Sequence, residues 1–144
     1  RVSNPVQITF DANDIARLAE FWADALGYVL QPPPDGFESW VQFLDERGIP
    51  EDERGQLAAI VDPAGVGPRI LFQLVPEGKT AKNRVHLDVN TSDQSADRET
   101  RKSQVYAKVA DLESKGAVRG EEFVVNGAPW VVMQDPEGNE FCVQ

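Results

Sequence analysis

The sequence predicts an α+β fold in which a βαβββ module occurs twice. Two observations predict it. Residues 6–10 and 85–89 both alternate apolar and polar side chains, and each segment precedes a helix-like segment. Asp62-Pro63-Ala64-Gly65 then reappears as Asp135-Pro136-Glu137-Gly138, again between two apolar runs. A recurrence after roughly seventy residues indicates a duplication rather than a solenoid, which needs three or more units.

The first half gives one strand, one helix and three further strands. Residues 6–10 have the period of a strand, and Asn13 or Asp14 offers an N-cap for a helix that ends near Leu26, with Gly27 as its C-cap. Apolar segments then predict strands at 28–30, 57–61 and 70–75, the last two forming a hairpin. Between them, residues 35–56 break the strand rhythm, and we expect an inserted short helix and an exposed acidic loop.

The second half repeats this order. A strand is expected at 85–89, and the charged segment 93–103 is expected to be a loop or the start of a helix. Val105, Val109 and Leu112 follow the helical period, and Gly116 ends that helix. Strands are expected at 123–125, 130–134 and 141–143. The chain is therefore predicted to be a single domain, residues 1–144, made of modules 5–76 and 84–144 joined by a polar connection.

Composition excludes several classes of function. A net charge of −10 argues against nucleic acid as a partner, because phosphate contacts need clustered Lys and Arg. It is compatible with a cationic ligand, although acidic surfaces mostly serve solubility. No apolar run is long enough for a membrane helix, so no membrane partner is expected. Cys142 is the only cysteine, which precludes an intramolecular disulfide and favours a cytoplasmic location.

Several motifs resemble a known family. They are Arg84-Val85-His86-Leu87-Asp88-Val89, Lys115-Gly116-Ala117 and the closing Gln134-Asp135-Pro136-Glu137-Gly138-Asn139-Glu140-Phe141-Cys142-Val143. Together with the duplicated order they resemble the vicinal oxygen chelate superfamily and, more narrowly, its glyoxalase-like, bleomycin-resistance-type proteins. The resemblance covers the chain except for residues 35–56. It implies the glyoxalase/bleomycin resistance/dioxygenase fold, a curved and incomplete barrel-like mixed sheet with helices outside, and a homodimer.

The resemblance also implies where a metal would lie. Enzymes of the superfamily hold a divalent cation with residues of the first and last strand of each module. Those positions fall on Gln7 and His86, and near Gln73 and on Cys142. Mg²⁺, Mn²⁺ and Fe²⁺ favour carboxylate and imidazole ligands, so only His86 is a strong ligand for them. No metal or other cofactor is therefore predicted, and His86 is the candidate ligand if one is present.

Two functions are compatible with the departure of this sequence from the superfamily's metal-ligand pattern. The first is a metal-independent protein that binds a small molecule, drug-like or metabolite, in a concave pocket lined by aromatic residues. The alternative is a metal-dependent lyase, isomerase or dioxygenase of the superfamily with an atypical metal site. The sequence leaves open whether any reaction is catalysed. Stoichiometric metal that is lost on His86→Ala would favour the enzyme.

Strand parity and composition select the candidate ligand-binding residues. Val85 and Leu87 are expected to face the helix, which leaves His86 and Asp88 facing the cavity. His86 is either a hydrogen-bonded core residue or a ligand contact or base. Buried Cys142 is interpreted as a packing residue, and Glu140 shares its parity. The full set is Gln7, Thr9, Trp40, Gln73, His86, Asp88, Trp130, Glu140 and Cys142.

The tryptophans add a second kind of candidate, because aromatic rings can stack on a planar or cationic ligand. Trp22 lies on the apolar stripe of the first helix and is expected in the core. Trp130 lies on a strand and is expected to line the cavity or a subunit contact. Trp40 and Phe37, both in the insertion, are expected to form a lid over the open side of the cavity.

Overall fold

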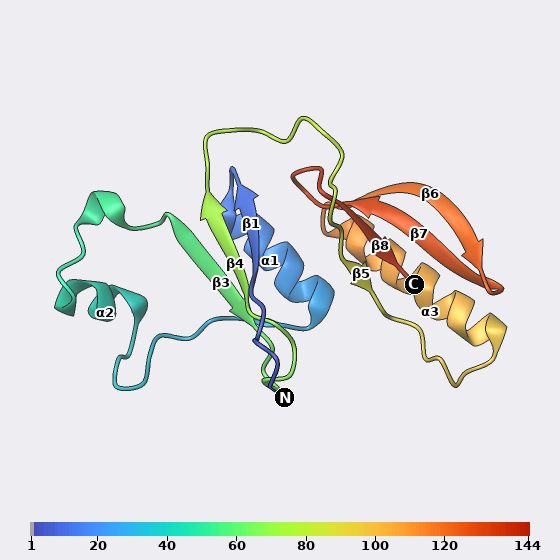
Figure 1. Cartoon of the computed structure of the whole chain (residues 1–144), viewed down its shortest axis with the longest axis horizontal. Coiled ribbons are helices and arrows are strands. Elements are labelled where there is room, and N and C mark those ends of the chain that lie inside the picture. Colours follow the sequence, from blue (N-terminus) through green and yellow to red (C-terminus); the bar gives the residue numbers. More distant parts are fainter. Residues whose placement is uncertain (1) are drawn as a thin grey trace. The chain divides into compact units, whose positions relative to one another are not determined.

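A computed structural model describes residues 2–144. The chain divides into two compact units, Arg1–Glu77 and Gly78–Gln144. The division falls inside the polar connection that the sequence indicates between its two repeats. Each unit has one sheet with a helix packed on one face (Figure 1). Among the residues that the structure describes, no helix is both long and apolar enough to span a membrane.

The first unit contains a four-stranded mixed sheet with the order β1-β4-β3-β2. Strands β1 and β4 are parallel, and the other neighbouring pairs are antiparallel. Two short helical elements, α2 and η1, lie in the connection between β2 and β3. The elements are β1 (Ile8–Ala12), α1 (Ile15–Leu26), β2 (Val29–Leu30), α2 (Trp40–Glu46), the 3-10 turn η1 (Glu51–Glu53), β3 (Leu57–Val61) and β4 (Ile70–Leu74).

The second unit repeats the topology, with the order β5-β8-β7-β6 and a parallel pair β5 and β8. Counted within each unit, both sheets have the strand order 1-4-3-2, so the predicted duplication and fold class are confirmed. The elements are β5 (Asp88–Val89), α3 (Arg98–Ser114), β6 (Val118–Val125), β7 (Ala128–Gln134) and β8 (Glu140–Val143).

Local sequence explains where α1 begins and ends. The Asp14 carboxylate accepts a hydrogen bond from the backbone N of Arg17 at 3.1 Å, which satisfies a free N–H of the first turn. Gly27 ends the helix at φ 70°, a left-handed conformation that glycine adopts without steric cost. The buried face of α1 meets the sheet through Trp22, whose ring lies 5.3 Å from that of Phe10. Trp22 is thus a core residue, as expected.

In the second unit the helix and the sheet share an equivalent core. Asp97 caps α3 by accepting from the backbone N of Thr100 at 2.9 Å. The buried stripe of α3 and the alternate residues of β7 and β8 are almost completely shielded from water. They are Val105, Val109, Leu112, Val131, Met133, Phe141 and Val143. Residues of the other parity, such as Cys142, therefore lie on the face of the sheet away from α3.

Strand β1 begins and ends two residues later than the expected 6–10, and two further strands differ more from the sequence-based expectation. Strand β5 spans only Asp88–Val89, and Val85 is 82% exposed, so the prediction that Val85 faces the helix is wrong. The physical reason is that pairing with β8 begins at Leu87, whose carbonyl accepts from the backbone N of Cys142. Strand β6 is longer than 123–125, because it continues through a register shift between Arg119 and Glu122.

The two units differ most in one connection. In the second unit, β6 and β7 are joined by a two-residue turn, Asn126-Gly127, whose φ values of 51° and 76° are those of a type I′ hairpin. In the first unit, residues 31–56 join β2 to β3 and contain α2 and η1. The insertion is therefore an addition to one copy of an otherwise repeated module.

Candidate ligand-binding site

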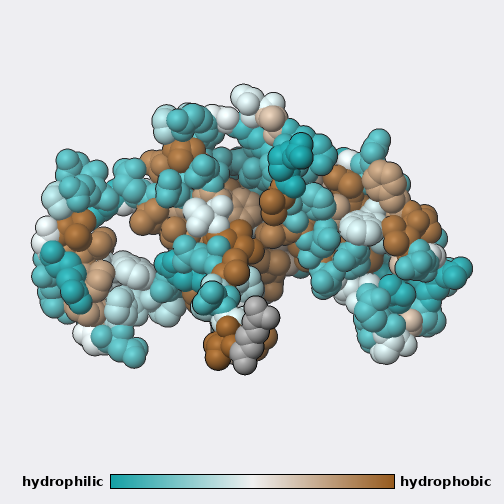
Figure 2. Space-filling view, in the orientation of Figure 1, coloured by the Kyte–Doolittle hydropathy of each residue, from teal (hydrophilic) through white to brown (hydrophobic). Residues whose placement is uncertain are grey.

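The insertion and the sheet of the first unit enclose a pocket of about 890 Å³. Its sheet side is formed by Ala59, Arg69 and Leu71, which have the opposite parity to the buried Ile60, Ile70 and Phe72. The pocket therefore lies on the face of the sheet away from α1. Its volume falls in the range of small-molecule sites. Apolar residues of the insertion, brown at the left of Figure 2, are exposed among hydrophilic ones.

Aromatic residues of α2 form the wall that the insertion contributes. The rings of Trp40 and Phe43 lie 5.7 Å apart and edge to face, and both residues line the pocket. Phe37 packs behind them, with its ring 5.0 Å from that of Phe43. The guanidinium of Arg47 lies over the Phe43 ring at 5.2 Å. Trp40 thus lines the pocket and Phe37 does not. That this segment acts as a lid stays a prediction.

Two hydrogen bonds hold this wall in place. The Ser39 hydroxyl caps α2 by accepting from the backbone N of Gln42 at 3.1 Å. The indole Nε1 of Trp40 donates to the backbone carbonyl of Gln31 at 2.9 Å, which ties the start of α2 to the end of β2. A hydrogen bond from a tryptophan to a fixed backbone carbonyl restrains the ring, so Trp40 presents a fixed apolar surface.

Arg69 is the polar centre of the pocket's sheet side. Its Nε and Nη2 donate to Oε1 of Gln31 at 3.0 and 2.8 Å, and its Nη1 donates to Oε1 of Gln7 at 2.6 Å. Both acceptors are neutral amides. No carboxylate forms an ion pair with Arg69 anywhere in residues 2–144. Gln7, a predicted ligand-binding residue, thus orients the guanidinium of Arg69 and does not itself line the pocket.

The other two candidates of the first unit lie on the same face but outside the pocket lining. Thr9 is exposed and is opposite Leu71, and Gln73 is exposed and is opposite Asp11. Gln7 is, by the same register, opposite Arg69. Gln7 and Gln73 are therefore four residues apart along a parallel pair of strands, about 13 Å at the rise of a strand. The structure does not bring these two amides together.

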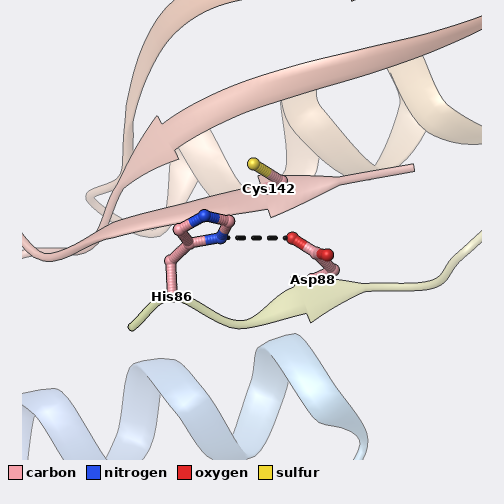
Figure 3. A group of neighbouring side chains, drawn as sticks. All are labelled: His86, Asp88 and Cys142. Atoms are coloured by element: carbon pink, nitrogen blue, oxygen red, sulfur yellow. Dashed lines mark ion pairs between the residues drawn. The ribbon is translucent and has the colours of Figure 1, made fainter. Parts of the chain in front are cut away.

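In the second unit, His86, Asp88 and Cys142 form one group (Figure 3). A donor atom from each lies within 4.8 Å of the others, and Nδ1 of His86 is 3.4 Å from Oδ1 of Asp88. Asp88 and Cys142 are direct partners in the β5–β8 pair, which explains why they meet. The sequence-based parity of His86, Asp88 and Cys142 agrees with this grouping on the face away from α3.

The environment of Cys142 favours the thiol over the thiolate. Burial raises its pKa, and the nearby Asp88 carboxylate raises it further, whereas the Trp130 indole N–H and Lys82 act in the opposite direction. The Trp130 Nε1 is buried and, among the described residues, has no acceptor in hydrogen-bonding geometry. The effect of the Trp130 indole on the pKa of Cys142 places the two side chains next to each other. With a raised pKa, Cys142 has the properties of a packing residue rather than a nucleophile.

The carboxylate of Glu140 is fixed by hydrogen bonds and is not available as a general acid. Its carboxylate accepts from the backbone N of Asn83 at 2.9 Å and from Nζ of Lys79 at 3.1 Å. The Asn83 hydrogen bond is the main cause that lowers the pKa of Glu140 to about 2, and Lys79 contributes. In β8 it shares the face of Cys142, as parity predicts, because their partners in β7 are Gln134 and Val132. At neutral pH Glu140 is an ionised anchor for the segment that precedes β5.

The residues do not fit the metal site that the superfamily resemblance implies. The only amide oxygen of Gln7 accepts a hydrogen bond from the Arg69 guanidinium, and a second cation beside it would be repelled. Gln73 does not reach Gln7, and Cys142 is a soft ligand where a hard cation needs a carboxylate. The His86, Asp88 and Cys142 group keeps two of the four implied positions and adds Asp88. It offers one nitrogen, one oxygen and one sulfur donor, a combination that suits zinc.

Sequence reasoning missed Phe43, Gln31 and the arginines of the pocket. Phe43 follows Trp40 by three residues, so its place on the same face of α2 could have been read from the helical period. Arg69 directly precedes β4, and strand parity alone would have placed it with Leu71 and Gln73. Its link to Gln31 carried no signal in the sequence, because these residues meet only through the pairing of β2, β3 and β4.

The sequence and the fold define the class of this protein. The family model of the glyoxalase-like domain matches residues 7–144, so the chain belongs to the glyoxalase-like family. No curated protein sequence matches it. The family model, together with solved structures of the same fold, confirms the resemblance that the motifs indicate.

Three of these structures show the range of the fold. A glyoxalase/bleomycin resistance protein/dioxygenase family enzyme from Burkholderia phytofirmans PsJN is 14% identical, with a TM-score of 0.62 over 95% of this chain and 94% of that one. The fosfomycin resistance protein FosX from Mesorhizobium loti is 8% identical, with a TM-score of 0.64 over 100% and 92%. Lactoylglutathione lyase from Agrobacterium tumefaciens is 14% identical, with a TM-score of 0.55 over 99% and 92%. At these identities the likeness is one of fold.

Proposed function

We propose that this protein binds a small organic molecule in the pocket of its first unit and releases it unchanged, as a metal-independent binder of the bleomycin-resistance type. The observation that carries the proposal is the inserted segment 31–56. It is the main departure from the repeat, and it places Trp40 and Phe43 over the exposed face of the sheet. An insertion that builds an apolar wall over a concave surface favours ligand binding over a purely structural role.

Three features of the pocket support this function. Its volume suits a drug-sized molecule. Its walls combine two edge-to-face rings with aliphatic side chains of β3, β4 and the segment after α2, such as Leu57, Leu71 and Ile49. Its few polar groups, above all Arg69, are held by neighbouring side chains rather than free to rotate. Such a preformed site loses little conformational entropy on binding.

Tryptophan fluorescence tests the proposal, because Trp40 lines the pocket whereas Trp22 lies in the core and Trp130 in the second unit. The protein is titrated with a panel of planar aromatics and cationic glycopeptides, and the Trp40→Phe variant identifies the signal from the pocket. We expect saturable quenching by at least one class of compound that is largely lost in the variant. A flat response over the whole panel would refute the proposal. Mass spectrometry of the recovered ligand checks that it is not converted.

The His86, Asp88 and Cys142 group favours one alternative, a zinc-dependent enzyme of the superfamily. Bound metal would lie in the second unit, on three donors that the strands already bring together. Elemental analysis of the purified protein distinguishes the two functions. Zinc at one equivalent per chain that is lost in the His86→Ala variant would favour the enzyme over the binding protein. A substoichiometric metal content that this substitution does not change would support the binding protein.

A further inference from the structure

We infer that the ligand of the pocket in the first unit is an organic anion, an apolar body that carries a carboxylate or a similar group bound by Arg69. This inference rests on the proposed function and names its ligand class. An anionic ligand is not what the net charge of the whole chain suggests, because a net charge of −10 is by itself compatible with a cationic ligand. The local charges of the pocket, rather than the total, decide which ligand is attracted.

The lining of the pocket is positively charged. Arg47, Arg54 and Arg69 line it, and Glu53 is the carboxylate among the described lining residues. Arg54 is already neutralised, because its Nη2 lies 2.8 Å from Oδ1 of Asp45 and its Nε and Nη2 donate to the carbonyl of Ile49. Arg54 therefore has a structural role, whereas no carboxylate in residues 2–144 balances the charge of Arg69.

Arg69 has the geometry of an anion receptor. A guanidinium has five N–H groups, and three of those of Arg69 are donated to Gln31 and Gln7. One N–H thus remains on each terminal nitrogen, and these are the two donors that we assign to a carboxylate of the ligand. The two glutamines fix the orientation of the group and leave its charge unbalanced, because amides are neutral. Arg69 is half-buried, so its field is screened less than that of a surface arginine.

The apolar part of the ligand follows from the rings of α2 and from the aliphatic side chains near Arg69. Trp40 and Phe43 line the pocket together with Leu57 and Leu71, and Leu71 is two residues after Arg69 and on the same face of the sheet. A molecule whose anionic group meets Arg69 would therefore lie with its body against rings and aliphatic side chains. A planar aromatic body fits this wall best, because rings can pack against Trp40 without loss of polar contacts.

Three probe compounds that share the same biphenyl group test the inference by isothermal titration calorimetry. They are biphenyl-4-carboxylate, biphenyl-4-methanol and biphenyl-4-methylamine, which differ at neutral pH in the sign of their charge. We expect the carboxylate to bind roughly ten- to a hundredfold more tightly than the alcohol, the range of a charge-assisted hydrogen-bonded pair. The amine is expected to bind more weakly than both. This comparison uses the unmodified protein and requires no variant to fold.

Variants then assign the preference to Arg69. Arg69→Met keeps an unbranched stem and removes the charge, and it should bind the carboxylate and the alcohol with equal affinity. Arg69→Lys keeps the charge but loses the two guanidinium donors, and it should retain only part of the preference. Arg17→Met, which removes an exposed arginine of α1 outside the pocket, is the matched control and should keep the full preference.

The outcomes separate the inference from the function on which it rests. If the alcohol or the amine binds as tightly as the carboxylate, the ligand is not selected by Arg69, and the inference fails while the pocket remains a binding site. A preference that survives Arg69→Met in a folded variant would also overturn it. If none of the three probes binds and the fluorescence panel is flat, the proposed function and the inference fail together.

Discussion

Gln7 and Arg69 are joined by a 2.6 Å hydrogen bond from Nη1 of the arginine to Oε1 of the amide. In the superfamily resemblance Gln7 occupies the position of a metal ligand, and in this chain its oxygen orients a guanidinium. The amide oxygen that a metal would need at this position is thus already used by the Arg69 guanidinium. The same hydrogen bond argues against a metal at Gln7 and orients the cation of the proposed anion site.

The first prediction concerns Trp40. Trp40→Phe keeps an aromatic ring but removes the hydrogen bond to the carbonyl of Gln31, so α2 is held less firmly over the pocket. A neutral hydrogen bond contributes about 1 kcal/mol, so binding of biphenyl-4-carboxylate should weaken about fivefold by calorimetry. Val41→Ala, a change on the same helix at a residue that does not line the pocket, is the control. An equal loss in both variants would show that only general loosening of α2 matters.

The second prediction concerns metal removal. Dialysis against EDTA should leave the affinity for biphenyl-4-carboxylate within about twofold, because the groups that we expect to bind it are side chains of the first unit. His86→Ala should have equally little effect. Calorimetry before and after chelation checks both expectations. A tenfold loss that zinc restores would contradict metal-independent binding.

The third prediction concerns the thiol of Cys142. Burial raises its pKa and shields its Sγ, so the folded protein should react with Ellman's reagent much more slowly than the protein in 6 M guanidinium chloride (about two orders of magnitude or more). Absorbance during the reaction gives both rates. Rapid modification of the folded protein at neutral pH would mean that the thiolate is accessible, and the interpretation of Cys142 as a packing residue would be abandoned.

The fourth prediction concerns the pH dependence of stability. The pKa of Glu140 is about 2 in the folded protein and near 4.5 as a free group, so the folded state is stabilised by ionised Glu140 at every pH above 4.5. This contribution is lost as the pH falls from 4.5 towards 2. Urea unfolding between pH 5 and pH 3 should show a steeper loss for the wild type than for Glu140→Gln. Glu121→Gln, which removes an exposed carboxylate of β6, should follow the wild type.

Local sequence signals accounted for most of the fold. The Asp14 cap, the Gly27 terminus and the apolar stripe of α1 are each encoded within a few residues, and hydrophobic periodicity senses such local patterns. The β6–β7 turn at Asn126-Gly127 is equally local. The extent of β5 was misjudged for the converse reason, because the alternation at 85–89 says nothing about whether a partner strand is present beside Val85.

The candidate site was predicted only in part. Parity gave the common face of His86, Asp88 and Cys142 because alternation in a strand is a property of the sequence itself. The sequence by itself thus determined the repeat, the strand and helix order, and the loss of the superfamily's ligand types. Only the tertiary structure decided that Gln31 and Gln7 meet Arg69, and that α2 encloses a pocket against its own sheet. Strand register and the path of the insertion bring these groups together, and both are set by contacts between residues distant in the chain.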